Sequence, residues 1–330
     1  MDILLLGGPR FLGYAVIEAS LAGGHNLTMF NRGRTNPHSF PGVERVVGER
    51  DGGLDGLAGR RWDVVIDTCG YVPRILRQSA QALADRVERY VFISTISVYA
   101  EPLSPGAGED APLAVLEDEA AEEVTGETYG GLKALCERTV QELFGERSLV
   151  IRPGLIVGPH DPSGRFTYWV TRLAEGGDVL APDDRQAPVQ MIDVRDLAEW
   201  TLRLAVARAG GVFNATGPAA PLTLEQTLLQ CQAEASSGAQ IVWVEPAFLH
   251  AAGVAPWTEL PLWAPGSEAL NQVSIAAAIA AGLTFRPLAQ TIDDTLAWAR
   301  MQPPPAAPRA GLTRDREAQL LCDYAGQAHV

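Results

Sequence analysis

Short apolar runs that alternate with helical patterns are the feature that most constrains the fold of this chain. Runs of this kind occupy residues 2–6, 26–30, 62–67, 90–94 and 149–152. Helical patterns at 11–21, 78–84 and 129–144 separate them. Continuous rather than alternating apolar runs are typical of strands buried on both faces. The first half of the chain therefore predicts an α/β fold with a doubly wound parallel sheet.

The second half has a less regular pattern and predicts a smaller lobe. We expect a loop over 158–164, a helix over 166–175, a strand and helix over 191–205, and a last strand over 211–214. Proline and tryptophan are more frequent after residue 217. These features predict a cofactor-binding core over 1–157 and 189–217, a substrate-binding lobe over 158–188 and 218–302, and a linker with a helical segment over 303–330.

Composition narrows the class of protein. No long uncharged apolar run predicts a membrane span, and the start of the sequence lacks the basic region of a signal peptide. The four cysteines lie far apart, which favours reduced thiols and a cytoplasmic location. The net charge of −14 disfavours binding to nucleic acid. The histidines have no metal-ligand spacing, so we expect no metal site.

A glycine-rich turn joins the first strand to the first helix. The predicted cofactor-binding residues in this turn are Gly7, Gly8, Arg10, Phe11, Leu12 and Gly13. A strand, glycine turn and helix in this order direct backbone N–H groups at a pyrophosphate. Arg10 stands where the Gly-x-x-Gly-x-x-Gly pattern has its middle glycine, so its side chain either crowds the pyrophosphate or lies beside the phosphates. The alternative is a turn that only connects strand to helix.

The ends of the next strands predict which cofactor binds. Asn31, Arg32 and Arg34 follow the second strand with no acidic residue among them, and guanidinium groups suit a ribose 2′-phosphate. We therefore expect NADP(H) to be preferred, with NAD(H) possible; the alternative is two solvated arginines. Asp51 is expected to approach the adenine amino group. The small residues Thr68, Cys69 and Gly70 would let the cofactor pass closely.

Tyr129 and Lys133 form a Tyr-x-x-x-Lys motif at the start of a predicted helix. Their spacing puts both side chains on one helical face, where the ammonium would lower the pKa of the phenol. The lysine could also hold the nicotinamide ribose. The hydroxyl groups that follow the strand at 90–93 could bind the reacting oxygen. Ligands of open α/β sheets bind at the carboxyl ends of strands, where these segments converge.

In combination these motifs resemble the extended short-chain dehydrogenase/reductases, which include the NAD-dependent epimerases and dehydratases. The resemblance covers about residues 1–217 and rests on the glycine turn, Ser94-Thr95-x-Ser-Val-Tyr, Tyr-x-x-x-Lys, Arg152-Pro153-Gly154 and the segment 192–198. The turn itself is similar to an atypical branch. The resemblance implies a Rossmann-type sheet with a smaller C-terminal substrate lobe. It also implies roles for single residues, with Thr95 as catalytic hydroxyl, Tyr129 as general acid/base, Lys133 as its partner, and Ser94, Pro153 and Gly154 beside the nicotinamide.

The resemblance implies hydride transfer, and the residues narrow the reaction. Dehydratases of this family carry an Asp-Glu pair after the catalytic threonine, whereas Ile96 and Ser97 follow Thr95 here. We therefore expect an NADP(H)-dependent reductase of a carbonyl in a small molecule such as a sugar nucleotide or a secondary metabolite. One alternative is a sugar-nucleotide epimerase with tightly held NAD. A second alternative is a non-enzymatic member that senses a cofactor or binds RNA.

Only a few residues predict the substrate contacts and the oligomeric state. Arg165 and Tyr168 follow the nicotinamide strand and are candidate substrate contacts; the alternative for Arg165 is a surface ion pair. In the family, the Tyr-x-x-x-Lys helix commonly packs against a partner subunit. We expect a homodimer in which that helix presents Leu132, Leu135, Cys136 and Val140.

Overall fold

The computed structural model describes residues 1–303 and 309–327, which divide into two compact units. Unit 1 combines Met1–Leu155, Val194–Ala219 and Val273–Phe285. Unit 2 combines Ile156–Asp193, Ala220–Gln272 and the described part of Arg286–Val330. The division expected from the sequence differs in four places, because residues 156–157 and 189–193 lie in unit 2, and residues 218–219 and 273–285 lie in unit 1. Most of the expected linker, residues 304–308, lies outside the described residues.

Unit 1 contains the Rossmann-type doubly wound parallel sheet that the apolar runs predict. Its seven strands lie in the order β11-β6-β5-β4-β1-β2-β3. The recorded pairings between neighbouring strands are parallel. The strand bounds are β1 (Asp2–Leu6), β2 (Asn26–Asn31), β3 (Glu44–Val47), β4 (Trp62–Asp67), β5 (Val87–Ile93), β6 (Ser148–Pro153) and β11 (Gly211–Ala215).

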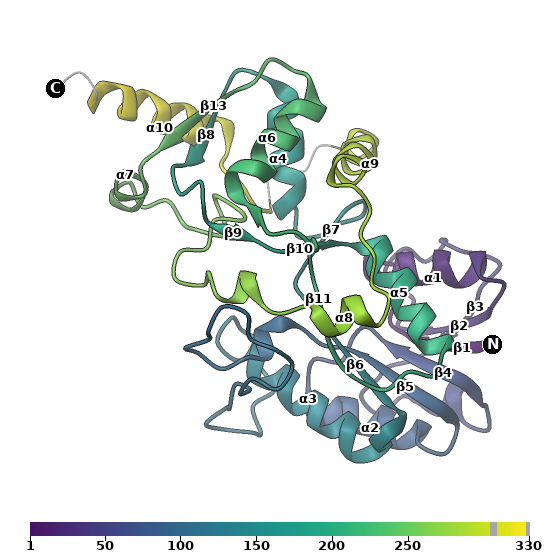
Figure 1. Cartoon of the computed structure of the whole chain (residues 1–330). Helices are drawn as coiled ribbons and strands as arrows, with labels where there is room; N and C mark the ends of the chain where they lie inside the picture. The colour runs from purple at the N-terminus through teal and green to yellow at the C-terminus, as the bar shows by residue number, and fades with distance from the viewer. Residues whose placement is uncertain (304–308, 328–330) are drawn as a thin grey trace. The chain divides into compact units, whose positions relative to one another are not determined.

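Helices cover both faces of this sheet (Figure 1). On one face α1 (Leu12–Ala22) packs against α5 (Val194–Val206), and on the other α2 (Pro73–Leu83) packs against α3 (Tyr129–Phe144). The shorter α8 (Ala276–Ala280) contacts β11. Three 3₁₀ turns complete the unit: η1 (Asp55–Leu57), η2 (Ile96–Val98) and η3 (Gly145–Arg147).

Burial on both faces explains why β1 is a continuous apolar run. Leu4 and Leu6 belong to the core cluster that includes residues of α2 and α3. Ile3 and Leu5 are equally buried but lie outside that cluster. Successive side chains of a strand point to opposite faces, so both faces of the sheet require apolar residues.

The burial of α3 removes the basis for the expected dimer contact. Leu132, Cys136 and Val140 are completely buried inside unit 1, and Leu135 is half-buried. The helix uses this apolar face to pack on the sheet and α2, so the three buried residues are not available for contact with a partner subunit.

Unit 2 consists of short strand pairs and helices. In it β8 (Asp178–Pro182) pairs in parallel with β13 (Gln240–Val244), and β9 (Pro188–Val189) pairs antiparallel with β12 (Leu222–Thr223). A further pair joins β7 (Leu155–Val157) and β10 (Met191–Asp193). The helical segments are α4 (Arg165–Glu175), α6 (Leu224–Ala235), α7 (Pro246–Ala251), η4 (Leu270–Gln272), α9 (Leu288–Arg300) and α10 (Arg314–Gln327).

The C-terminal helix α10 packs back onto unit 2. Glu317 is buried and accepts a hydrogen bond from Arg172 at 2.6 Å and one from the backbone of Leu180 at 3.1 Å. These bonds join α10 to α4 and β8 within the unit.

A buried ion pair joins α3 to β6 in unit 1. The guanidinium of Arg152 donates to both carboxylate oxygens of Glu137, at 2.7 Å in the shortest contact. The same guanidinium donates to the Tyr99 hydroxyl and to the backbone carbonyl of Glu109, each at 3.0 Å. Tyr99 in turn donates to Asn214 at 2.6 Å. The network thus fastens the chain that follows η2 to the ends of β6 and β11.

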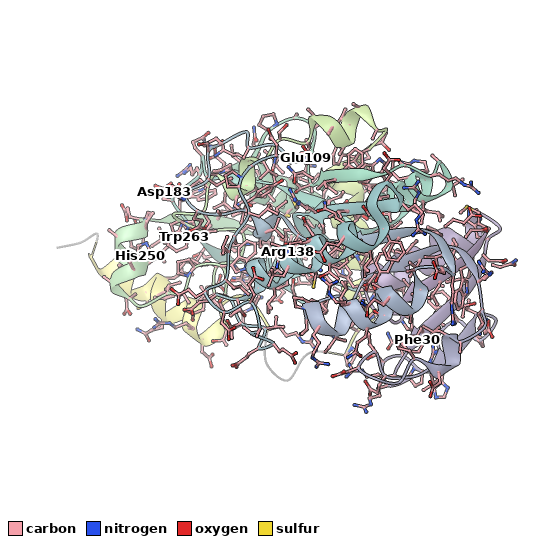
Figure 2. The ribbon with its side chains drawn as sticks, turned by 90° about the horizontal axis from the view of Figure 1, so that it is seen from below. Phe30, Glu109, Arg138, Asp183, His250 and Trp263 are labelled. Atoms are coloured by element: carbon pink, nitrogen blue, oxygen red, sulfur yellow. The ribbon has the colours of Figure 1, made fainter. Side chains whose placement is uncertain are left out.

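We predict that Glu137→Gln lowers the free energy of unfolding by about 3–5 kcal/mol, because it leaves the buried Arg152 without a counter-charge. The matched control is Glu119→Gln, which makes the same change in the exposed ion pair between Glu119 and Arg138 on α3 (Figure 2). That pair is screened by water, so the control should unfold like the wild type. Urea unfolding monitored by circular dichroism measures both variants. Equal effects would contradict the importance of burial.

Candidate active site

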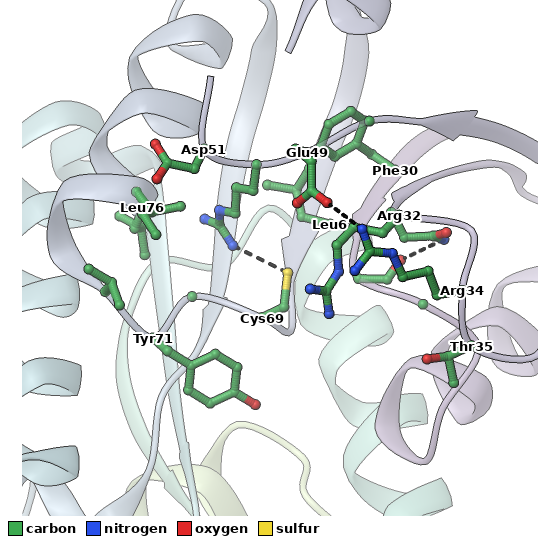
Figure 3. Close-up of a pocket in the computed structure, with 18 of the residues that line it drawn as sticks. Leu6, Phe30, Arg32, Arg34, Thr35, Glu49, Asp51, Cys69, Tyr71 and Leu76 are labelled. Carbon is green, nitrogen blue, oxygen red and sulfur yellow. Dashed lines mark hydrogen bonds and ion pairs between the residues drawn. The ribbon is translucent and has the colours of Figure 1, made fainter. Parts of the chain in front are cut away.

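A cavity of about 380 Å³ opens at the carboxyl ends of four neighbouring strands of unit 1 (Figure 3). Its lining residues come from the chain that follows β1, β2, β3 and β4. They include eight residues expected to bind the cofactor, namely Gly7, Gly8, Asn31, Arg32, Arg34, Asp51, Cys69 and Gly70. The position agrees with the rule that open α/β sheets bind ligands at this edge.

The glycine turn is shaped by two close approaches. Gly7 has φ of 138°, and a Cβ atom there would lie 2.3 Å from the Thr68 hydroxyl. A Cβ on Gly13 would lie 2.1 Å from the carbonyl oxygen of Gly8. Gly13 is therefore required for closure of the turn itself. Gly8 has room for a side chain within the protein and lines the cavity.

Two side chains of this turn stand out. Phe11 precedes α1 with φ of 44° and ψ of −110°, a conformation that costs about 1–3 kcal/mol in a residue with a Cβ atom. Leu12 then begins the helix. Arg10 is exposed, and its charge acts on the phenol of Tyr71. Burial nevertheless raises the pKa of Tyr71 to about 12.

An acidic residue that the sequence reading overlooked lies beside the predicted phosphate site. Arg32 and Arg34 are both exposed at the cavity, and Arg34 forms an ion pair with Glu49 at 3.4 Å (Figure 3). The residues that follow β2 include no acidic side chain, but Glu49 reaches Arg34 from the end of β3. Asn31 joins the first two strand ends, since its side-chain amide donates to the Gly7 carbonyl at 3.1 Å.

A second overlooked residue, Arg50, lines the cavity itself. Arg50 donates to both carboxylate oxygens of Asp67, at 2.6 and 2.5 Å, and to the Cys69 sulfur at 3.3 Å. Tyr90 also donates to Asp67, at 2.7 Å. Burial alone would raise the pKa of Asp67, but the charge and hydrogen bonds of Arg50 hold it below its usual value. The ion pair fixes the end of β4 under the cavity.

Asp51, expected near the adenine, is engaged by another side chain. It lines the cavity and accepts two hydrogen bonds from Arg74, at 2.8 and 2.9 Å. Arg74 also donates to Glu122 at 2.5 Å. The hydrogen bonds from Arg74 lower the pKa of Asp51, so it is a charged acceptor at the rim.

Lys133 is buried at the ends of β4 and β5. Its ammonium donates to the carbonyl oxygens of Gly70 at 2.8 Å and Ile93 at 2.6 Å. It lies 4.1 Å from the centre of the Phe92 ring and 5.3 Å from that of Tyr71. Burial lowers its pKa to about 8. Its ammonium is therefore much easier to deprotonate than that of an exposed lysine.

The sequence held a further signal about this residue. Lys133 is the single lysine among the 26 lysine and arginine residues of the whole chain. A guanidinium stays charged in proteins, whereas an ammonium can lose its proton when buried. The one side-chain amine of this chain therefore lies in the Tyr-x-x-x-Lys motif, whereas every other basic residue counted there is an arginine.

Tyr129 and Thr95 come together where α3 begins. Tyr129 is the first residue of the helix, and a Cβ atom on the next residue, Gly130, would lie 2.1 Å from the carbonyl oxygen of Ser97. This close approach brings the phenol to the Thr95 hydroxyl. Burial raises the pKa of Tyr129, and hydrogen bonding with Thr95 opposes the rise. The expectation that Lys133 lowers this pKa is wrong for this structure, because the lysine points to the carbonyls of Gly70 and Ile93.

The residues expected at the nicotinamide surround the end of β6. Ser94 is buried, and its hydroxyl has no partner within residues 1–303 and 309–327. Pro153 ends β6, and a Cβ atom on Gly154 would lie 2.3 Å from the hydroxyl of Thr216. The Thr216 hydroxyl is also buried and unpartnered in the described chain. Two buried hydroxyl groups that flank β6 thus lack the hydrogen bonds that a bound ligand can provide.

The two candidate substrate residues lie at the start of α4 in unit 2. The guanidinium of Arg165 stacks 5.0 Å from the ring centre of Trp257. Tyr168 is buried, with its ring 5.0 Å from that of Trp169 and tightly against Gly311. These contacts of Tyr168 are those of a core residue. Elsewhere in this unit Trp263 is also buried, donates to Asp184 at 3.1 Å and lies beside His250 (Figure 2).

The described residues contain neither a helix that could span a membrane nor a cluster of metal ligands. No helix within them is long and apolar enough to cross a membrane. No group of three or more histidine, cysteine, aspartate or glutamate residues within them is arranged to hold a metal ion.

Comparison with known proteins gives a family match over part of the chain and a shared fold. Residues 60–216 match the sequence model described as "NAD dependent epimerase/dehydratase family". Among curated proteins, the chain is 25% identical to the chloroplast stem-loop binding protein of 41 kDa b from Arabidopsis thaliana. That match covers 234 residues, which are 65% of this chain and 58% of the relative, so it spans less than two thirds of the relative's length.

Solved structures share the fold at low sequence identity. The UDP-N-acetylglucosamine 4-epimerase of Bacillus cereus matches with a TM-score of 0.66 and 14% identity, over 91% of this chain and 99% of that one. The UDP-glucose 4-epimerase of Thermus thermophilus, solved in complex with NAD, matches with a TM-score of 0.65 and 18% identity, over 92% and 100% of the two chains.

The lowered pKa of Lys133 predicts how stability changes with pH. Between its folded value of about 8 and the ordinary 10.5, the unfolded chain binds a proton that the folded chain has lost. Folding is therefore favoured as pH rises through this window, by about 3 kcal/mol in total. The Lys133→Met variant has no amine that titrates at this position. Between pH 8 and 10.5, the free energy of unfolding of the wild type should therefore rise by that amount relative to the variant. Urea unfolding across this range measures the difference, and a constant difference would contradict the lowered pKa.

Proposed function

We propose that the chain is an NAD(P)-dependent oxidoreductase acting on a carbonyl or hydroxyl group of a small molecule, because residues 60–216 match the model of the NAD dependent epimerase/dehydratase family. The observation that supports this most is the placement of Tyr129, Thr95 and Lys133. Helix α3 brings Tyr129 and Lys133 to the ends of β4 and β5, where Thr95 follows β5, beside the cavity that the glycine turn lines.

The residues around the cavity fit a nicotinamide dinucleotide. The turn from Gly7 to Gly13 and the start of α1 present backbone N–H groups for a pyrophosphate. The unpartnered hydroxyl groups of Ser94 and Thr216 are suited to a carboxamide, and Lys133 to ribose hydroxyl groups. Such a cofactor supplies the hydride that no protein side chain can supply.

Tyr129 is the proposed general acid and base. In reduction its phenol gives a proton to the carbonyl oxygen while the carbonyl carbon accepts the hydride, and solvent later restores the proton. In oxidation the same groups act in reverse. Thr95 donates a hydrogen bond to the reacting oxygen, and this bond strengthens as the oxygen gains negative charge.

NADP(H) is the proposed cofactor because Arg32 and Arg34 are exposed at the cavity with no competing acid on their own strand end. Glu49 opposes this choice, since its carboxylate neutralises part of the charge of Arg34 and could accept hydrogen bonds from ribose hydroxyl groups. The balance between two arginines and one glutamate decides the preference.

We predict that NADPH binds more tightly than NADH, and that Arg32→Ala weakens NADPH binding alone by about 1.5–3 kcal/mol, the value of a hydrogen bond to a charged group. Arg61→Ala is the matched control, because it removes the same charge just before β4, at the opposite edge of the sheet. Fluorescence titration with both nucleotides gives the dissociation constants. Equal or tighter binding of NADH by the wild type would overturn the proposed preference.

A sugar-nucleotide epimerase is the second candidate function. The Thr95, Tyr129 and Lys133 set is sufficient for reversible oxidation, and the solved structures that share the fold include UDP-sugar 4-epimerases. An epimerase keeps its nucleotide bound through the cycle. Mass spectrometry of nucleotides released from the purified protein, together with an assay for epimer formation from UDP-sugars, distinguishes this candidate from net reduction.

A stem-loop RNA is the third possible ligand, since the Arabidopsis relative is named for stem-loop binding. The net charge of −14 disfavours it, as does the segment 101–128, which contains acidic residues but no lysine or arginine. Salt-dependent gel shifts with a stem-loop RNA test this ligand. Tight binding together with a lack of turnover would replace the enzymatic proposal.

We predict that Tyr129→Phe lowers turnover by about 10²–10⁴, the usual value of positioned acid–base catalysis, and leaves nucleotide affinity unchanged. Tyr324→Phe removes the same hydroxyl group in α10 of unit 2 and should have no effect on turnover. Thr95→Val should impair turnover more than nucleotide binding, whereas Lys133→Met should impair both. Steady-state kinetics with any carbonyl that the wild type reduces provide the measurement. Full activity of Tyr129→Phe would refute the assignment.

A further inference from the structure

Tyr71 lies at the boundary between the nucleotide cavity and the catalytic lysine. The lining of the cavity includes Cys69, Gly70 and Tyr71, but it does not include Lys133, Tyr129 or Thr95. The Tyr71 side chain points into the lower end of the cavity (Figure 3). Its ring centre is 5.3 Å from the Lys133 nitrogen. The cavity therefore ends at Tyr71, and the lysine lies behind it.

Among the groups recorded around the Lys133 ammonium, Tyr71 alone has an exposed side chain. Phe92 and Ile93 are buried, and Gly70 is fixed because a Cβ atom there would lie 2.7 Å from both Leu76 and Phe92. Tyr71 is 45% exposed, while Lys133 is 3% exposed. Movement of the Tyr71 side chain would thus uncover the ammonium without any change in the sheet.

The contacts of Tyr71 allow such movement. Its hydroxyl makes no hydrogen bond to the described residues, so rotation of the side chain breaks none. The backbone before it is held firmly, since Cys69 donates to Asp67 at 3.0 Å and Asp67 is paired with Arg50. The Tyr71 side chain can therefore rotate while the backbone at the end of β4 stays in place.

We propose that Tyr71 is a gate over Lys133, closed in the nucleotide-free protein and displaced by the ribose of the nicotinamide half of a dinucleotide. This inference rests on the proposed function and deepens it, because it says how the lysine becomes available. With the gate closed the amine is dry and faces two rings. With the gate open its third N–H, which neither carbonyl accepts, can reach a ribose hydroxyl. Tyr71 is thus a positioning residue that acts through Lys133.

The single lysine makes the gate directly measurable. In the purified chain Lys133 and the N-terminal amine are the only amines, so acetylation at each is assigned unambiguously by peptide mass spectrometry. At pH 10.5, with the N-terminus as internal reference, Tyr71→Ala should be acetylated at Lys133 at least 10-fold faster than the wild type. Tyr71→Phe is the matched control and should react like the wild type, because the ring and not the hydroxyl forms the cover. A melting curve by circular dichroism verifies that both variants are folded.

The pKa of Lys133 gives an independent readout. Other titratable or charged groups act on this ammonium as well, and they remain in the variant: Cys136, Asp67, Glu137 and Arg50. Removal of the ring admits water, so the ¹⁵Nζ resonance of lysine-labelled Tyr71→Ala should titrate above the wild-type value of about 8. Unchanged acetylation and an unchanged titration in a folded Tyr71→Ala protein would overturn the gate.

Nucleotides separate failure of the gate from failure of the proposed function. We expect 2′,5′-ADP, which has no nicotinamide half, to leave the slow acetylation of wild-type Lys133 unchanged. NADP⁺ should alter its rate and shift its ¹⁵N resonance. If Tyr71→Ala exposes the amine but no dinucleotide binds, the gate stands and the proposed cofactor fails. If dinucleotides bind but the Lys133 amine is as slowly acetylated in Tyr71→Ala as in the wild type, the proposed cofactor stands and the gate is overturned.

Discussion

The close approach of α3 to the ends of the central strands is the constraint on which the rest of the site depends. Gly130 lets the helix begin against the Ser97 carbonyl, which sets Tyr129 beside Thr95. One turn later Lys133 bonds the carbonyls at the ends of β4 and β5. A further turn along, Glu137 pairs with Arg152 of β6. A single helix therefore supplies the reactive side chains and the ion pair that holds them in register.

Burial of Lys133 links stability to reactivity. Taking an ammonium out of water disfavours its charged form, and two carbonyl bonds and two rings compensate only in part. The buried ammonium is therefore a cost to the folded state at neutral pH. An arginine at this position would remain charged across the whole range of pH.

Charge at the cavity is set by residues from different strand ends. Arg32 and Arg34 follow β2, while Glu49, Arg50 and Asp51 follow β3. Parallel strands bring these ends together, so Glu49 meets Arg34, and Arg50 pairs with Asp67 of β4. Cofactor preference thus depends on pairings across the sheet as well as on the residues of a single turn.

The sequence by itself determined the sheet, the glycine turn and the Tyr-x-x-x-Lys helix, because strands buried on two faces and closely spaced motifs leave local patterns. The single lysine was visible there too. Only the tertiary structure decided that Glu49 reaches Arg34, that Thr216 and Ser94 flank β6, that α3 buries Leu132 and Val140, and that Tyr71 covers Lys133. These relations join segments far apart in the chain. No local pattern encodes them, because they follow from the order in which the strands pair.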